Sequence, residues 1–231
     1  MTPTTPLAAL AFSGGMDSTT LAAHYHGLGY DLLLLSFNYG QRHLREIAAA
    51  QTIAAHYGAE HHVVDLDGLG ALMPGSALTD GTVDVPEGHY AEASMRATVV
   101  PNRNAIMANI AAGIASARGA LVVALGIHAG DHAVYPDCRP AFLEALQRSV
   151  TAALDGFPTP TVEAPFLHLT KTDIARAGVR LDAPVALSWS CYKGGAFHCG
   201  RCGTCVERHE AFVDAGLVDP TRYEVADEVT V

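Results

Sequence analysis

Short apolar runs alternate with longer amphipathic segments along the first half of the chain. The apolar runs cover residues 7–12, 31–37, 61–66 and 120–125. Runs of this kind are typical of strands that are buried on both faces of a sheet. The segments with apolar residues at helical spacing are 18–28, 41–57 and 104–118. Because strands and helices alternate, the sequence predicts an α/β fold with a doubly wound, mainly parallel sheet.

Two of these helical segments have a recognisable apolar face. In the segment 41–57, the residues on one side are Leu44, Ile47, Ala48, Ile53 and Ala54. In the segment 104–118, isoleucines recur every four residues, at Ile106, Ile110 and Ile114, with Ala and Gly between them that allow close packing. We expect both faces to pack against the sheet.

The other parts of the chain follow a different pattern. Residues 67–100 form a long irregular stretch with Pro, Gly and acidic residues, which we expect to be a lid or a dimer loop. Another helix is expected after Tyr135–Pro140. From residue 158 onward the chain carries one helical segment and a cluster of cysteines. We therefore predict a main domain at 1–157 and a C-terminal extension at 158–231 that packs on it.

Composition and charge narrow the functional classes. The chain has 231 residues and a formal net charge of −10, and only two of its basic residues are lysines, Lys171 and Lys193. No basic cluster offers long-range attraction to a nucleic-acid backbone, so we expect no nucleic-acid partner. No apolar run approaches the roughly 20 residues that a membrane-spanning helix needs. Together with the absence of a signal-peptide pattern, this predicts a soluble cytoplasmic protein without a membrane partner.

A glycine turn follows the first predicted strand and leads into the first predicted helix. Its residues are Phe12, Ser13, Gly14, Gly15, Met16, Asp17, Ser18, Thr19 and Thr20. Ligands of open α/β sheets bind at the carboxyl ends of strands, and a helix start offers free N–H groups and partial positive charge to an anion. The turn has neither the Gly-Lys-Ser/Thr ending of a Walker A loop nor the G-x-G spacing of the dinucleotide fingerprint. It predicts a nucleotide phosphate site of another kind.

Three charged residues are candidates for this site. Asp17 either caps the helix or holds a divalent cation that bridges phosphates, and the sequence leaves both open. Arg103 follows Asn102 at the start of a helix, where it is either a surface charge or a planar bidentate donor to phosphate or carboxylate. Lys171 lies in Thr170–Asp173, which resembles a capping arrangement, and it could reach the phosphates.

The cysteines indicate a metal centre. Cys191, Cys199, Cys202 and Cys205 lie within fifteen residues of one another. Four thiolates with two-residue spacers suit tetrahedral Zn2+, and a site closed by four protein ligands is structural. An iron–sulfur cluster is the rival, but the Cys-Pro ending of the ferredoxin motif is absent. The fifth cysteine, Cys138, is expected to pack as a small apolar residue rather than act as a nucleophile.

Several separate segments resemble those of one family. They are F-S-G-G-M-D-S at 12–18, N-Y-G-Q-R-H at 38–43, V-P-N-R-N at 100–104, Y-P-D-C-R-P at 135–140, S-W-S-C-Y-K-G-G at 188–195 and C-G-R-C-G-T-C-V-E-R at 199–208. The glycine turn resembles the PP-loop of the N-type ATP pyrophosphatases. All segments together resemble the QueC family of queuosine-precursor biosynthesis, from Ser13 to Phe212. The one departure is Ser188, where that family has Thr.

The resemblance implies an adenine-nucleotide alpha-hydrolase-like fold and a ligase activity. The implied reaction converts 7-carboxy-7-deazaguanine and ammonia to 7-cyano-7-deazaguanine, with Mg2+-ATP consumed to AMP and pyrophosphate through adenylated acid and amide intermediates. It also implies a homodimer. The implied catalytic residues are Asp17, Arg103 and Lys171, and residues 12–20 bind ATP. Tyr39 and Trp189 are candidates for stacking on the heterocycle, with Asp137 and Arg139 nearby.

Two other functions fit part of the pattern. A tRNA-modifying PP-loop protein would also adenylate a base oxygen, although the acidic charge balance counts against it. A nucleotide-sensing zinc module would bind ATP without hydrolysing it. The motif around His128, Asp131 and His132 follows a strand end, on the expected ligand side, but its spacing specifies no metal geometry.

Overall fold

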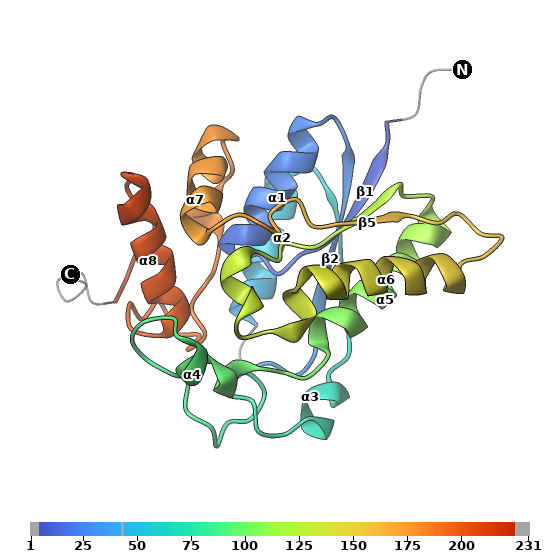
Figure 1. The fold of residues 1–231 in the computed structure, drawn as a ribbon. Coiled ribbons are helices and arrows are strands. Elements are labelled where there is room, and N and C mark those ends of the chain that lie inside the picture. Colours follow the sequence, from blue (N-terminus) through green and yellow to red (C-terminus); the bar gives the residue numbers. More distant parts are fainter. Residues whose placement is uncertain (1–4, 43, 225–231) are drawn as a thin grey trace.

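The computed structural model describes residues 5–42 and 44–224 (Figure 1). Its strands form one parallel sheet in the order β3-β2-β1-β4-β5. The strands are β1 (Leu7–Ala11), β2 (Asp31–Asn38), β3 (Glu60–Asp65), β4 (Val122–Ala124) and β5 (Thr161–Glu163). Each of the four strands predicted in the first half is confirmed to within two residues at either end.

Helices cover both faces of this sheet. They are α1 (Met16–Gly27), α2 (Arg45–Tyr57), α3 (Gly68–Leu72), α4 (Glu92–Met95), α5 (Arg103–Arg118), α6 (Pro140–Ala153), α7 (Lys171–Arg180) and α8 (Gly203–Ala215). Short 3-10 helices lie at Arg96–Thr98, Ala129–His132, Pro136–Cys138 and Val185–Leu187. The helix expected after Tyr135–Pro140 is confirmed as α6.

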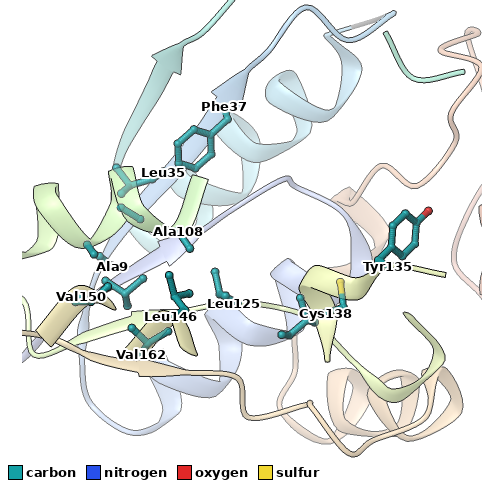
Figure 2. Close-up of a cluster of buried hydrophobic side chains, with 14 of the residues drawn as sticks. Ala9, Leu35, Phe37, Ala108, Leu125, Tyr135, Cys138, Leu146, Val150 and Val162 are labelled. Atoms are coloured by element: carbon teal, nitrogen blue, oxygen red, sulfur yellow. The ribbon is translucent and has the colours of Figure 1, made fainter. Parts of the chain in front are cut away.

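Alternation along β1 and β2 divides the core into two layers. Ala8 and Leu10 face one side, where they pack with residues of α1, α2 and α7. Ala9 and Leu35 face the other side, where Figure 2 shows them with side chains of α5 and α6 such as Ala108 and Leu146. The predicted doubly wound α/β fold is therefore confirmed. The strand order changes direction between β1 and β4, and ligands bind at the carboxyl ends of strands at such a point.

The buried faces of two helices agree with the prediction only in part, on α5 through the small residues and on α2 with two exceptions. On α5 the fully buried residues are alanines, including Ala111 and Ala115, whereas Ile106, Ile110 and Ile114 are half-buried. Alanine side chains let a helix approach a sheet more closely than isoleucines do, so the small residues take the innermost positions. On α2, residues Ile47, Ile53 and Ala54 are buried as predicted, but Leu44 and Ala48 are exposed. Leu44 precedes the first turn of that helix and so lies outside its face.

The C-terminal segment contains more structure than the single helix predicted. It supplies β5, which pairs with β4 and completes the sheet, and two helices, α7 and α8, which contact each other. The Tyr25 hydroxyl of α1 donates a 2.5 Å hydrogen bond to Glu163 of β5. The division at 157/158 stays a prediction. In the part of the chain that the structure describes, every helix is too short or too polar to cross a bilayer.

Candidate functional site

The glycine turn joins β1 to α1 and is held in shape by its own hydroxyl groups. Gly14 has φ +79°, and a Cβ at this position would lie 2.5 Å from the carbonyl oxygen of Glu46, so only glycine fits. The Ser18 hydroxyl accepts a 3.1 Å bond from the Gly14 N–H and lies 3.2 Å from the Ser13 hydroxyl. The Trp189 N–H donates to the Gly14 carbonyl at 2.8 Å. The loop therefore depends on both α2 and the C-terminal segment.

A cavity opens where this turn meets the carboxyl ends of β1, β2 and β4. Most of the predicted site residues line it, namely Phe12, Ser13, Gly15, Met16, Asp17, Ser18, Tyr39, Arg103, Lys171 and Trp189. The other three residues of the turn do not line the cavity: Gly14 contacts α2, and the Thr19 and Thr20 hydroxyls donate to backbone carbonyls of the first turn of α1. The two threonines therefore stabilise the start of the helix.

Lys171 lies at the centre of a partly buried charge cluster at one end of the cavity. Its Nζ is 2.7 Å from Asp17 Oδ2, 3.3 Å from Glu207 Oε2 and 3.5 Å from His128 Nε2. The backbone places it there, because Thr170 and Asp173 form a reciprocal capping box at the start of α7. The predicted capping arrangement is confirmed, and it aims Lys171 into the cavity.

Electrostatics keep the pair of Asp17 and Lys171 ionised. Burial raises the pKa of Asp17, but Lys171 and His128 together outweigh burial and hold the pKa of that carboxyl below its ordinary value. Burial alone would lower the pKa of Lys171, whereas Asp17 and Glu207 raise it above its ordinary value. Burial also raises the pKa of Glu207, partly offset by Lys171.

The second carboxylate oxygen of Asp17 is suited to a cation. Asp17 Oδ1 is buried, and it has no hydrogen-bond partner among the described residues. Buried acceptors without a partner are costly unless a ligand satisfies them, and carboxylate oxygens are preferred ligands of Mg2+. Asp17 therefore fits a divalent cation at this position.

The other half of the cavity combines an arginine, a glutamate and tyrosines. Arg103 Nη1 donates a 3.2 Å hydrogen bond to the Tyr39 hydroxyl, and the guanidinium lies 5.6 Å from the centre of the Tyr39 ring. Glu46, from the first turn of α2, also lines the cavity. Burial raises the pKa of Glu46 to about 7, although Arg103 opposes this shift. Tyr192 lines the same half.

Two residues predicted to lie near the substrate have other partners. Asp137 Oδ2 accepts a 2.8 Å bond from the Asn104 N–H, which lies in the first turn of α5. Arg139 is exposed, and its Nε donates to the His132 carbonyl at 2.7 Å. Neither residue lines the cavity. Their roles toward a substrate stay predictions, and the structure gives Asp137 a role in holding α5.

Cys138 lies under the cavity at the edge of the buried cluster in Figure 2. Burial raises the pKa of its thiol well above the ordinary value, and Asp131 and Asp137 add to the effect. Asn104 Nδ2 donates to its sulfur at 3.1 Å. A neutral, buried thiol of this kind packs rather than attacks a substrate.

The four clustered cysteines form a buried centre beside the cavity. The sulfur atoms of Cys191, Cys199, Cys202 and Cys205 all lie within 4.8 Å of one another. Backbone N–H groups point at two of these sulfurs: those of Lys193 and Cys199 at Cys191, and those of Arg201 and Cys202 at Cys199, at 3.3–3.4 Å. This donor set fits a tetrahedral metal ion held by four thiolates, so the cysteines can hold a metal such as zinc.

His198 lies beside this centre without belonging to it. Its Nε2 accepts a 3.0 Å bond from the Ser190 N–H, and its ring lies 4.3 Å from that of Trp189. The Trp189 indole N–H donates to the Cys191 carbonyl at 2.8 Å. Trp189, predicted as a stacking residue, therefore links the cysteine centre to the cavity.

Three acidic residues of the cavity were absent from the predicted site or had no role assigned there. Asp131 lies 3.5 Å from His128 Nε2 and accepts a bond from the Tyr90 hydroxyl at 3.3 Å. Glu207 comes from α8, two residues after Cys205, and Glu46 from the start of α2. Two of them carried a sequence signal: Asp131 directly follows a strand end, and Glu207 lies in the C-G-R-C-G-T-C-V-E-R segment.

Comparisons with known proteins agree with this geometry. A family model described as Queuosine biosynthesis protein QueC matches residues 7–216. Proteins named 7-cyano-7-deazaguanine synthase from Paracoccus denitrificans and Brucella anthropi are 56% and 53% identical to the chain, over 93% of its length and 92% of theirs. A structure from Methanocaldococcus jannaschii, described as a predicted subunit of a tRNA methyltransferase, is 17% identical with a TM-score of 0.50, covering 75% of this chain and 74% of that one. That likeness shows the fold alone.

Proposed function

Since the chain belongs to the QueC family of queuosine biosynthesis proteins, we propose that it converts 7-carboxy-7-deazaguanine and ammonia to 7-cyano-7-deazaguanine with ATP. The relatives that carry this activity in their names cover almost the whole chain. The observation that supports the proposal is the single cavity that joins the glycine turn, two cationic side chains and an aromatic half. Its lining therefore offers groups for a phosphate chain and for a flat heterocycle in the same cavity.

The chemistry explains why a phosphate site is needed. A carboxylate is a poor electrophile, so its oxygen first attacks the α-phosphorus of ATP and pyrophosphate leaves. Ammonia then adds to the acyl adenylate, AMP leaves, and one proton is released as the amide forms. A second ATP adenylates the amide oxygen, again with loss of pyrophosphate and of one N–H proton. Loss of AMP and the remaining N–H proton gives the nitrile.

The charged residues of the cavity have distinct roles in this proposal. The glycine turn binds the pyrophosphate end of ATP, and Asp17 would hold the Mg2+ ion, which supplies charge neutralisation to the phosphates. Lys171 and Arg103 stabilise the negative charge that develops as the bond between the α and β phosphates breaks. Tyr39 and Trp189 flank the heterocycle. Asp137 and Arg139 stay near it in the proposal, Asp137 through the start of α5 that it holds and Arg139 through its bond to the His132 carbonyl.

The remaining properties in the proposal concern the whole enzyme. We propose a ligase that acts in the cytoplasm as a homodimer on small molecules, with no nucleic-acid or membrane partner. One structural zinc per chain is proposed for the four cysteines. The net charge of −10 supports small-molecule substrates over a polyanion.

The direct test supplies the purified enzyme with Mg2+-ATP, ammonium and 7-carboxy-7-deazaguanine. We expect the nitrile together with two AMP and two pyrophosphate for each molecule converted. The amide intermediate supplied in place of the acid should require one ATP. Release of ADP without nitrile would contradict the proposal, and tight, steeply salt-dependent binding of tRNA would favour a tRNA-modifying enzyme instead.

A further inference from the structure

Glu46 and Arg103 are an acidic and a basic side chain that line the same cavity, and Arg103 acts on the Glu46 carboxyl by its charge. Arg103 is paired with the neutral Tyr39 hydroxyl rather than with a carboxylate. Within the described residues, the Glu46 carboxylate has no hydrogen bond to a side chain or backbone group and no cation within 4 Å. The three other carboxylates of the cavity are all engaged by Lys171, His128 or Tyr90. With Asp17 assigned to the cation, Glu46 is the carboxylate that the heterocycle can take as its partner.

The proposed substrate carries a matching set of groups. The six-membered ring of a deazaguanine presents an N–H at position 1 and an amino group at position 2, which are two adjacent donors in one plane. Its O6 and its 7-carboxylate are acceptors on the neighbouring edge. A carboxylate accepts two parallel N–H bonds in a bidentate geometry, and a guanidinium donates to acceptors in the same way. A glutamate and an arginine in one cavity therefore complement the donor edge and the acceptor edge of this ring.

We propose that Glu46 is the residue that selects the deazaguanine ring, by accepting hydrogen bonds from the ring N1–H and the 2-amino group. This inference rests on the proposed function, because it assigns a partner to that substrate. Arg103 then faces O6 and the carboxylate that reacts. Glu46 is a specificity-determining residue in this arrangement and takes no part in breaking or forming bonds.

The position of Glu46 in the fold supports this role. Its carbonyl oxygen lies 2.5 Å from the position that a Cβ of Gly14 would take, so the start of α2 is packed against the glycine turn. A ring held by Glu46 is thereby fixed relative to the phosphate site. Leu78 and Met107, which line the same cavity, offer apolar surface to the ring faces.

The surroundings of Glu46 predict a pH dependence of substrate binding. The groups that face it are Arg103 from α5, Tyr39 after β2 and Tyr192 from the C-terminal segment. Burial raises the pKa of Glu46 to about 7. Below this pH the carboxyl is protonated and loses one of its two acceptor positions. We therefore expect the KM for the heterocycle to rise as pH falls below about 7, while the KM for ATP changes less.

The test compares two substrates in two proteins. The substrates are 7-carboxy-7-deazaguanine and the analogue that lacks the 2-amino group, and the proteins are the native enzyme and Glu46→Gln. The native enzyme should prefer the amino-bearing substrate, and Glu46→Gln should reduce that preference in kcat/KM by about 10- to 100-fold. The loss should lie in KM for the heterocycle, with kcat at saturation and KM for ATP nearly unchanged. The KM of Glu46→Gln should also lack the rise below pH 7.

Other results would overturn the inference or the function separately. If Glu46→Gln keeps the preference, or loses kcat with an unchanged KM, Glu46 does not read the ring edge; the second result would make it a proton-transfer group. If the native enzyme converts neither heterocycle, the proposed function fails. Glu144→Gln, an exposed glutamate of α6, is the matched control and should behave as native. If Glu46→Gln does not fold, Glu46→Asp serves in its place because it keeps the charge. Its preference for the amino-bearing substrate should be weaker than that of the native enzyme but still present.

Discussion

At the scale of single residues, Lys171 owes its position in the cavity to the charged groups around it. Its ammonium group contacts Asp17 and Glu207 and lies near His128, so its charge is more than balanced by two carboxylates. A phosphate chain entering the cavity offers Lys171 a further anionic partner. Glu207 can then keep Lys171 in place while Asp17 turns to the cation that accompanies the phosphates. The pair seen in the structure is therefore consistent with a resting arrangement of the proposed site.

Replacing Asp17 with Asn should separate catalysis from folding. The substitution removes the carboxylate that we assign to Mg2+, but Glu207 continues to balance Lys171. We expect turnover to fall by about 100-fold or more, because charge stabilisation at the phosphates is lost. The melting temperature should change by only a few degrees. Steady-state AMP release and a thermal melt measure the two effects, and the exposed Asp155→Asn is the matched control. An active Asp17→Asn enzyme would refute the role.

The sequence identifies those site residues whose motif lies within one short segment of the chain. The glycine turn, the capping box and the cysteine spacing each lie within fifteen residues, and the structure places their members together. Glu46 gave no signal, because an acidic residue in a helix is common on any surface, and Glu207 stood in the cysteine segment without a role assigned to it. They become part of a site only when α2 and α8 pack beside β1 and α7. Three-dimensional packing, rather than spacing, assigns them.

At the level of elements, the β1–α1 turn lies in close contact with the backbone of α2. Gly14 approaches the backbone at Glu46 and Ala50 so tightly that an added Cβ would lie 2.5 Å and 2.6 Å from their atoms. The first turn of α1 is thus fixed against a second helix. Within the turn, the Gly14 and Gly15 N–H groups donate to the Ser18 and Ser13 hydroxyls at 3.1 and 3.2 Å, so its side chains stabilise the conformation that packs against α2.

Gly14→Ala should therefore destabilise the protein. The substitution adds a clash with α2 and places alanine at φ +79°, which together should cost about 2 to 5 kcal/mol of unfolding free energy. Gly27→Ala, at the end of the same helix, is the matched control, since nothing lies within 4 Å of an added Cβ there. It should be neutral or stabilising by up to about 1 kcal/mol. Urea unfolding of both variants tests the difference, and equal stability would disprove the close contact.

Sequence patterns predicted which elements exist better than which faces they bury. The short apolar runs were sufficient to predict the strands, because a continuous apolar run of this length is typical of a strand that is buried on both faces of a sheet. On α2, Leu44 and Ala48 were placed on the buried side but are exposed, since hydrophobicity alone does not show where a helix begins or which of its turns faces the sheet. β5 was missed because three residues at the edge of a sheet leave too short a pattern, and its place depends on pairing with β4.

Across the whole molecule, the cysteine centre joins segments that are far apart in sequence. Ala77 and Val85 of the long 67–100 stretch pack in one buried cluster with the four cysteines. The Gly88 N–H donates to the Arg201 carbonyl at 2.8 Å, and the Gly203 N–H to the Pro86 carbonyl at 3.3 Å. The same stretch contributes Tyr90 to the cavity, and α8, which starts at the centre, contributes Glu207. A metal held there would therefore organise one wall of the site.

Removing that metal should loosen this wall while the sheet stays folded. Elemental analysis should first give one zinc per chain, whereas iron with visible absorbance would contradict the assignment. After chelation, amide exchange at Gly88 and Gly203 should become faster, because the bonds that protect them depend on the centre. Leu33 and Leu34, in the middle of the sheet, should stay protected until global unfolding.

The same treatment should lower the melting temperature by at least about 5 °C, since structural metal binding contributes directly to folding free energy. Cys202→Ser should reproduce all of these effects without a chelator. Cys138→Ser is the matched control, because it removes the one cysteine outside the cluster and should retain the metal. If Gly88 exchanges equally fast with and without metal, the cysteine centre holds only α8, and the long stretch is fixed by its apolar contacts alone.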